Sequence, residues 1–205
     1  MNRNLDAAHP AAHSADSLAA LRAATASRHV ALDSGLPIGA PDASLDDYTA
    51  HLDLLRAWLA PLQAWLAGFA DGPALDHGAR LGLIETDLAE AGAPVQGGPE
   101  TPPHAWPAAA SPAYRWGVHY VIEGSQLGGA VLYERLRERL APHRLRYLEG
   151  DAAGPGPRWR SFMQALRASV RTPAEIEEAC AGACAAFDRI LELRAGSRPA
   201  SPPCA

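Results

Sequence analysis

The sequence contains no lysine, so its 18 basic side chains, histidine aside, are all arginine. They are outnumbered by 23 acidic residues, and the resulting net charge of −5 argues against a nucleic-acid surface. No apolar run reaches the length of a bilayer-spanning helix, and the first residues lack the apolar core of a signal peptide. We therefore expect a cytoplasmic protein that binds neither nucleic acid nor a membrane.

Cysteine is scarce as well: the chain has only Cys180, Cys184 and Cys204. An odd number of cysteines without CxxC spacing argues against a framework of disulfides. Cys180 and Cys184 would share one face of a helix. We interpret them as two small buried thiols, with metal binding as the alternative.

Strand-like alternation is missing over any useful length, and so are internal repeats. Apolar residues recur instead at helical spacing, which predicts an all-α fold with six to eight helices around one core. The length of 205 residues suits a single domain, expected at 15–195, and we take a monomer as the default. Segments 1–14 and 196–205 have the composition of disordered tails.

Start and stop signals place the helices along the chain. The Gly- and Pro-rich segments 92–112 and 148–157 are predicted loops. Pro61 is expected to kink or divide the helix that contains it. The expected helices run from 14 or 17 to 32, from 44 onward through Pro61, and over about 73–90, 112–139, 157–170 and 172–193.

The first predicted helix carries a histidine on its apolar face. That face is formed by Leu18, Leu21, Thr25, His29 and Leu32. A lone histidine in such a position is more often a hydrogen-bonded core residue than a ligand. Three neighbours favour a ligand: Asp33 lies one turn on, Arg22 lies two turns back, and Thr25 is small.

The neighbours of His29 suggest how it would bind a metal. A carboxylate at Asp33 can accept a hydrogen bond from one imidazole nitrogen and leave the other free for a metal ion. Arg22 is placed to pair with an anion near the ligand, although a solvated surface arginine is the alternative. Two interpretations of His29 therefore stay open at this point, a hydrogen-bonded core residue and a metal ligand.

The second unusual segment is EGSQLGG, residues 123–129, inside the long helix expected at 112–139. Glycine in a helix costs about 1 kcal/mol relative to alanine, so a cluster of three needs a reason. Gly124, Gly128 and Gly129, with Ser125, form a groove without large side chains. Either a broad ligand or another helix lies close to this backbone. A membrane-type helix dimer is excluded by the charged residues around the segment.

In combination and order, these segments resemble the heme oxygenase family. LRAATASRH (21–29) is similar to the proximal-helix pattern L-x-x-A-T-x-x-x-H. EGSQLGG is similar to the distal pattern G-S-x-L-G-G of bacterial members, including those that supply bacteriophytochromes with chromophore. WRSFMQAL (159–166) and ACAAF (183–187) resemble the C-terminal helices of the family. The resemblance covers about residues 17–193.

The resemblance implies a heme oxygenase-like fold, with heme b between the first helix and the long distal helix. It implies that His29 faces inward as the axial iron ligand, that Asp33 orients it, and that Arg22 contacts a heme propionate. The residues implied for the distal wall are Gly124, Ser125, Gly128 and Gly129. Thr25, Tyr120, Arg160 and Arg167 are further candidates for contact with heme.

The activity implied is cleavage of heme, with O₂ and reducing equivalents, to biliverdin, ferrous iron and CO. The expected partners are an electron donor, either a ferredoxin or a reductase, and a bacteriophytochrome that accepts biliverdin. Many family members carry Asp where this chain has Ser125. Because a hydroxyl does not ionise at neutral pH, the alternative is a heme carrier or sensor on the same fold without turnover. A di-iron oxidase is disfavoured because no histidine follows a glutamate at the required spacing.

Overall fold

The computed structural model describes residues 16–71, 77–93 and 105–196, and within these ranges the chain is entirely helical. This confirms the predicted fold class. The described elements are α1 (Ser17–Asp33), the 3₁₀-helix η1 (Pro37–Gly39), α2 (Leu45–Leu66), α3 (His77–Glu90), α4 (Pro112–Leu136), α5 (Arg146–Glu149), α6 (Pro155–Ser169) and α7 (Pro173–Gly196).

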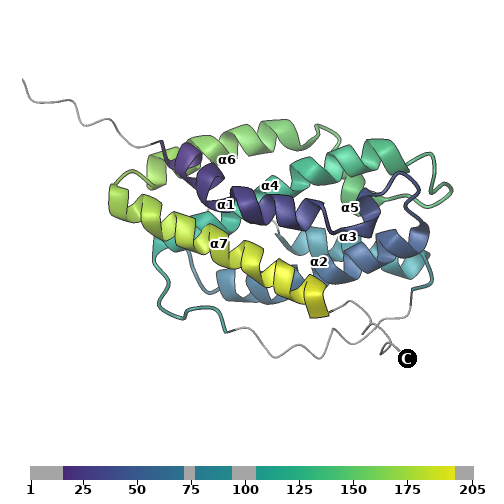
Figure 1. Ribbon diagram of the computed structural model, residues 1–205, viewed down its shortest axis with the longest axis horizontal. Coiled ribbons are helices and arrows are strands. Elements are labelled where there is room, and N and C mark those ends of the chain that lie inside the picture. Colours follow the sequence, from purple (N-terminus) through teal and green to yellow (C-terminus); the bar gives the residue numbers. More distant parts are fainter. Residues whose placement is uncertain (1–15, 72–76, 94–104, 197–205) are drawn as a thin grey trace, which may run out of the picture.

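The helices form a bundle in which α7 makes the most extensive contacts. It packs most extensively against α4 and also against α1 and α2, while α6 contacts both α1 and α4 (Figure 1). Helices α2 and α3 pack together on the side of the bundle away from α6 (Figure 1). The short helix α5 packs against both α3 and α4. The buried residues of all these helices form one hydrophobic core.

Local signals explain where the helices begin. The Asp16 side chain accepts a hydrogen bond from the Leu18 amide at the start of α1. Ser44 and Asp47 form a reciprocal capping box at the start of α2. Ser111 caps α4, and its hydroxyl accepts a hydrogen bond from the Tyr114 amide.

Several boundaries differ from the sequence prediction. Pro61 lies inside α2, which continues as one helix from Leu45 to Leu66, so of the expected kink or division, the division is wrong. Helix α4 ends at Leu136 rather than near residue 139, and α6 begins at Pro155 because a proline is well tolerated in the first turn of a helix. The short helices η1 and α5 were not predicted.

The expected tails and loops are only partly tested. Residues 1–14 and 94–104 lie outside the described residues, as does the C-terminal segment except for Gly196, which is the last residue of α7. In the first expected loop the only described helical residue is Pro112, where α4 begins, and α5 and α6 extend into the second loop. None of the helices that the structure describes is long and apolar enough to cross a membrane.

Helices α4 and α7 meet through two glycines. A Cβ at Gly117 would overlap the backbone of Ala179, whose carbonyl carbon would be 2.7 Å away, and one at Gly182 would be 2.8 Å from the carbonyl carbon of Tyr114. No side chain fits at either position. Close backbone contact therefore fixes the N-terminal half of α4 against α7.

The other end of α4 is held by arginines. Arg135 donates hydrogen bonds to the carbonyl oxygens of Gly39 (2.9 Å) and Ala40 (3.1 Å) in the segment that follows α1. Just beyond α4, Arg139 donates to the carbonyl oxygens of Asp42 and Ala43, each at 3.0 Å. These bonds connect the end of α4 to the connection between α1 and α2.

Candidate functional site

His29 lies near the C-terminal end of α1, and 64% of its side chain is exposed. The prediction that it faces inward is therefore wrong. Beyond the buried Thr25, the side of α1 that faces α7 carries Arg28, which pairs with Asp188 at 2.7 and 3.0 Å. His29 stands at the edge of this contact, with its ring centroid 5.9 Å from that of Phe187. Its imidazole is accessible to a ligand from outside the core.

Asp33 contacts the same imidazole. Its Oδ2 lies 3.0 Å from Nδ1 of His29, as the spacing of four residues on a helix allows. With a hydrogen on Nδ1, the ring presents an unprotonated Nε2 to a ligand. The pair has the geometry of a metal-binding histidine oriented by a carboxylate.

The glycines of the EGSQLGG segment are not in close contact with another helix. A Cβ at Gly128 would meet nothing within 4 Å, and one at Gly129 would lie 3.7 Å from Leu148 Cδ2. At Gly124 the nearest atom would be Trp159 Cη2, at 3.7 Å. These are open space or ordinary contacts, unlike the overlaps at Gly117. The structure therefore gives no support to helix packing as the reason for this cluster.

Ser125 uses its hydroxyl within its own helix. The hydroxyl donates to the carbonyl oxygen of Ile122 at 2.8 Å and lies 3.4 Å from Nε2 of Gln126. Gln126 Nε2 also donates to the hydroxyl oxygen of the buried Tyr147 at 3.1 Å. Because its hydrogen is used in this way, Ser125 can bind a water molecule only as an acceptor, unless the hydroxyl rotates.

Three of the predicted residues meet where α1 approaches the N-terminal half of α4. Burial raises the pKa of the Tyr120 phenol, and this effect is partly offset by the charge of Arg22 and by hydrogen bonding with Arg22 and Thr25. The Thr25 hydroxyl also donates to the Leu21 carbonyl oxygen at 2.8 Å. Arg22 itself is exposed. The structure thus brings a cation of α1 and a phenol of α4 together.

Helix α6 borders the same region with an aromatic side chain. Trp159 packs against Tyr120 and against Phe162, with ring centroids 5.6 Å apart in each pair. Arg160 and Arg167 lie seven residues apart on α6, and both are exposed. Arg167 is 3.6 Å from the carboxylate of Asp16, at the start of α1.

A buried ion cluster supports α4 behind the glycines. Glu123 is 2% exposed, and its carboxylate lies 2.8 Å from Arg80 of α3 and 2.8 Å from Arg158 of α6. Burial by itself would raise the pKa of Glu123, but hydrogen bonds and charges from the two arginines outweigh it and hold that pKa below its usual range. The cluster connects α3, α4 and α6 at the start of the glycine segment.

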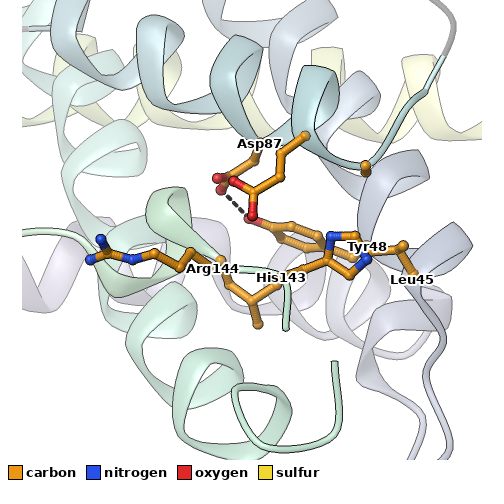
Figure 2. A pocket seen from close by; sticks show the side chains of 8 residues that line it. Leu45, Tyr48, Asp87, His143 and Arg144 are labelled. Carbon is orange, nitrogen blue, oxygen red and sulfur yellow. Dashed lines mark hydrogen bonds between the residues drawn. The ribbon is translucent and has the colours of Figure 1, made fainter. Parts of the chain in front are cut away.

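A second polar cluster positions Tyr147. The carboxylate of the buried Asp87 accepts hydrogen bonds from the Tyr48 hydroxyl (2.6 Å), the Tyr147 amide (2.9 Å) and Arg146 (3.2 Å). Figure 2 shows the Tyr48 hydroxyl directed at Asp87, in a pocket also lined by His143. Asp87 therefore fixes α5, and with it the tyrosine that contacts Gln126.

Two apolar side chains beside the site are uncovered. Among the large hydrophobic residues that the structure describes, Val30 is 67% exposed and Val131 is 63% exposed. Val30 follows His29 on α1, and Val131 lies about one turn beyond Gly128 on α4. Both helices thus present apolar surface next to the residues singled out from the sequence.

The cysteines on α7 are half-buried thiols. Cys184 donates to the carbonyl oxygen of Ala24 at 3.5 Å, and burial raises the pKa of Cys180. Within the described ranges no group of three or more His, Cys, Asp or Glu side chains could hold a metal ion. Cys204 lies outside those ranges.

Sequence reasoning missed the residues that hold the site from other helices. Asp188 and Arg194 of α7, and Tyr147 of α5, contact α1 or α4 across long sequence separations. Helical periodicity identifies the partners of a residue only on its own helix, so no local signal could have found these contacts.

Comparison with known proteins gives two matches and one negative result. No protein-family model matches the chain. A curated protein of Xanthomonas campestris pv. campestris (strain 8004), named heme oxygenase, is 37% identical over 155 residues, which are 73% of this chain and 87% of that protein. The NO- and CO-bound heme oxygenase from Neisseria meningitidis has a similar fold, with a TM-score of 0.67 and 26% identity over 88% of this chain and 91% of that one. With this identity and coverage, and with the fold in agreement, the chain belongs to the heme oxygenase family.

Proposed function

We propose that this chain binds heme between α1 and α4 and cleaves it to biliverdin, ferrous iron and CO. As a member of the heme oxygenase family, it is an enzyme of heme degradation. The observation that carries the site is the accessible imidazole of His29 held by the Asp33 carboxylate on α1, and the open space at Gly128 on α4 supports it. Heme is the substrate, and its iron is where O₂ is activated.

His29 is the axial ligand in this proposal. Nε2 would bind the iron while Asp33 accepts a hydrogen bond from Nδ1, which fixes the tautomer and the orientation of the ring. A neutral imidazole also suits the reaction electronically, because it donates less electron density than a thiolate and therefore favours O–O cleavage less. Val30 adds an exposed apolar side chain beside this ligand.

Gly124, Gly128 and Gly129 form the distal wall. Their lack of side chains lets the backbone of α4 approach a flat ligand closely, and at Gly128 nothing in the described structure occupies that space. Ser125 would hold a water molecule that passes protons to the reacting substrate. Its oxygen is the acceptor, since its hydrogen is donated to Ile122.

The charged edge of the porphyrin would lie toward Arg22. Arg22 would pair with one propionate, while Thr25 and Tyr120 contribute hydroxyls beside it. Arg160 and Arg167 are the candidates for the other propionate. Of these two we favour Arg160, because Arg167 already has Asp16 as a partner.

The remaining parts of the proposal concern the type of heme, the electron donor and the protein that accepts biliverdin. We assign the substrate as heme b and the electron donor as a ferredoxin or a reductase, since the reaction takes its electrons from outside the chain. A bacteriophytochrome as acceptor of biliverdin, a cytoplasmic location and a monomeric state belong to the same proposal. The GSQLGG form of the distal segment supports the acceptor.

A hemin titration followed by reduction tests the site and the activity. The wild-type protein should give a Soret band on titration, and with ascorbate, or with ferredoxin and its reductase, that band should decay as biliverdin absorbance grows. His29→Ala should lose the spectrum of an imidazole ligand. His143→Ala is the matched control, because His143 lines a pocket at α2, α3 and the start of α5, away from α1.

Two outcomes would contradict the proposal in different ways. A Soret band that persists under reduction in air, with no biliverdin, would indicate a carrier or sensor and remove the proposed turnover. An unchanged ligand spectrum in His29→Ala would instead remove the assignment of the axial ligand. Separation of the product isomers would identify which meso position is cleaved.

A further inference from the structure

The C-terminal turn of α1 is held by an arginine from another helix. The last carbonyl oxygens of a helix have no partner within that helix, and α1 has no basic residue of its own in its last turn. Arg194 of α7 donates to the carbonyl oxygens of Ala31 (2.6 Å) and Leu32 (3.1 Å). Its positive charge also lies at the negative end of the dipole of α1.

Gly35 provides the space for this guanidinium. A Cβ at this position would overlap the end of the Arg194 side chain, with Cζ 2.6 Å and Nη2 3.1 Å away. Gly35 does not have the positive φ that often explains a glycine after a helix. Glycine therefore leaves room for the Arg194 guanidinium, which a Cβ at this position would displace.

Other residues on the same face of α7 contact the C-terminal part of α1. Phe187 lies against the His29 ring, and Asp188 binds Arg28 through two hydrogen bonds. Arg194 is seven residues beyond Phe187, two turns further along the same face. Helix α7 therefore fixes α1 both at the histidine and at the turn that follows it.

We propose that Arg194 is a positioning residue for the axial ligand, and this inference rests on the proposed function of His29. Asp33 is the last residue of α1, so its contact with His29 exists only while the turn between them stays helical. Helix ends fray, and the two carbonyl groups that Arg194 binds lie inside this turn. By holding this turn in helical form, Arg194 maintains the contact between Asp33 and the His29 imidazole. Gly35 leaves the space that the Arg194 guanidinium occupies.

Hydrogen exchange on the heme-free protein tests the contact itself. In Arg194→Ala, the amides of Ser34 and Gly35, which bond to Val30 and Leu32, should exchange about tenfold faster. Gly35→Ala should give the same effect by displacing the guanidinium. The double variant should be no faster than either single variant, and Arg194→Lys should restore part of the protection.

The matched control is Arg171→Ala, an exposed arginine at the other end of the α7 region. It should leave exchange in this turn unchanged. Equal exchange in Arg194→Ala and wild type would overturn the inference, as would additive effects of the two substitutions. Because Gly35→Ala perturbs the contact without altering Arg194, the test does not depend on the folding of a single variant.

The heme-loaded protein tests positioning as distinct from stability. In the ferrous state, the iron–histidine stretching band in resonance Raman spectra should shift and broaden in Arg194→Ala and Gly35→Ala, and recover in Arg194→Lys. An unchanged band together with faster exchange would overturn the positioning role and leave a structural one. Absence of any His29-dependent band in the wild type would refute the proposed function itself, and the exchange data would still report on the contact.

Discussion

His51 provides a prediction whose magnitude follows from its burial. Its Nδ1 on α2 is buried and finds no hydrogen-bond partner among the residues described. Burial disfavours the imidazolium and lowers the pKa of His51 from its ordinary value of 6.5 to about 4. The folded protein therefore binds this proton less readily than the unfolded chain does. The contribution of neutral His51 to the free energy of unfolding is therefore fully present above pH 6.5, and it is lost as the pH falls toward 4.

Linkage converts these two pKa values into a free energy. Between pH 7 and pH 5 the unfolded chain protonates His51 almost completely while the folded protein does so little. The free energy of unfolding should fall over this interval by about 2 kcal/mol from this residue alone. Below pH 4 both states are protonated and the slope from His51 vanishes.

Urea unfolding at a series of pH values measures this contribution. The difference in unfolding free energy between pH 7 and pH 5 should be smaller by about 2 kcal/mol in His51→Leu than in the wild type. Between pH 7 and pH 9 the two proteins should show the same dependence, which serves as the internal control. Parallel curves down to pH 5 would refute the reasoning and show that His51 takes up its proton in the folded state.

Three further predictions concern the stability of variants in α4, two at glycines and one at a buried carboxylate. Gly128→Ala should stabilise the heme-free protein by about 1 kcal/mol in thermal unfolding, since a Cβ meets nothing there, but should weaken hemin binding; destabilisation would contradict this. Gly117→Ala should destabilise the fold by at least about 1–3 kcal/mol, because its Cβ would overlap the Ala179 backbone, and a wild-type melting temperature would count against that contact. Glu123→Gln should cost about 3–5 kcal/mol in urea unfolding by leaving two arginines without their buried carboxylate, and a loss below about 1 kcal/mol would show that solvent reaches them.

Residues on a single helix were the predictable part of the site. The four-residue spacing of His29 and Asp33 is sufficient to predict their contact, and the observed 3.0 Å follows from helix geometry. The all-helical class follows in the same way from periodicity. The orientation of His29 does not, because it depends on how α7 packs against α1, a contact between distant parts of the sequence that includes Arg28 and Asp188.

The glycines of α4 likewise show that contacts between helices could not be predicted from the sequence. Sequence alone could not decide whether Gly124 and Gly128 face a helix or a ligand, since either would account for the missing side chains. The structure places the backbone of α7 against Gly117, which the pattern did not single out, and shows no close helix backbone at Gly128. Likewise, α2 continues through Pro61, although proline in a helix interior removes a backbone hydrogen bond.

The two attachments of α4 have a mechanical consequence. The helix is clamped near Gly117 by α7, and the guanidinium of Arg135 fastens its far end to Gly39 and Ala40. A rod supported at both ends bends most easily along its weakest span, which here is the stretch 124–129. Since the far support is the connection that leaves α1, shortening or lengthening that connection would change how α4 is placed relative to α1.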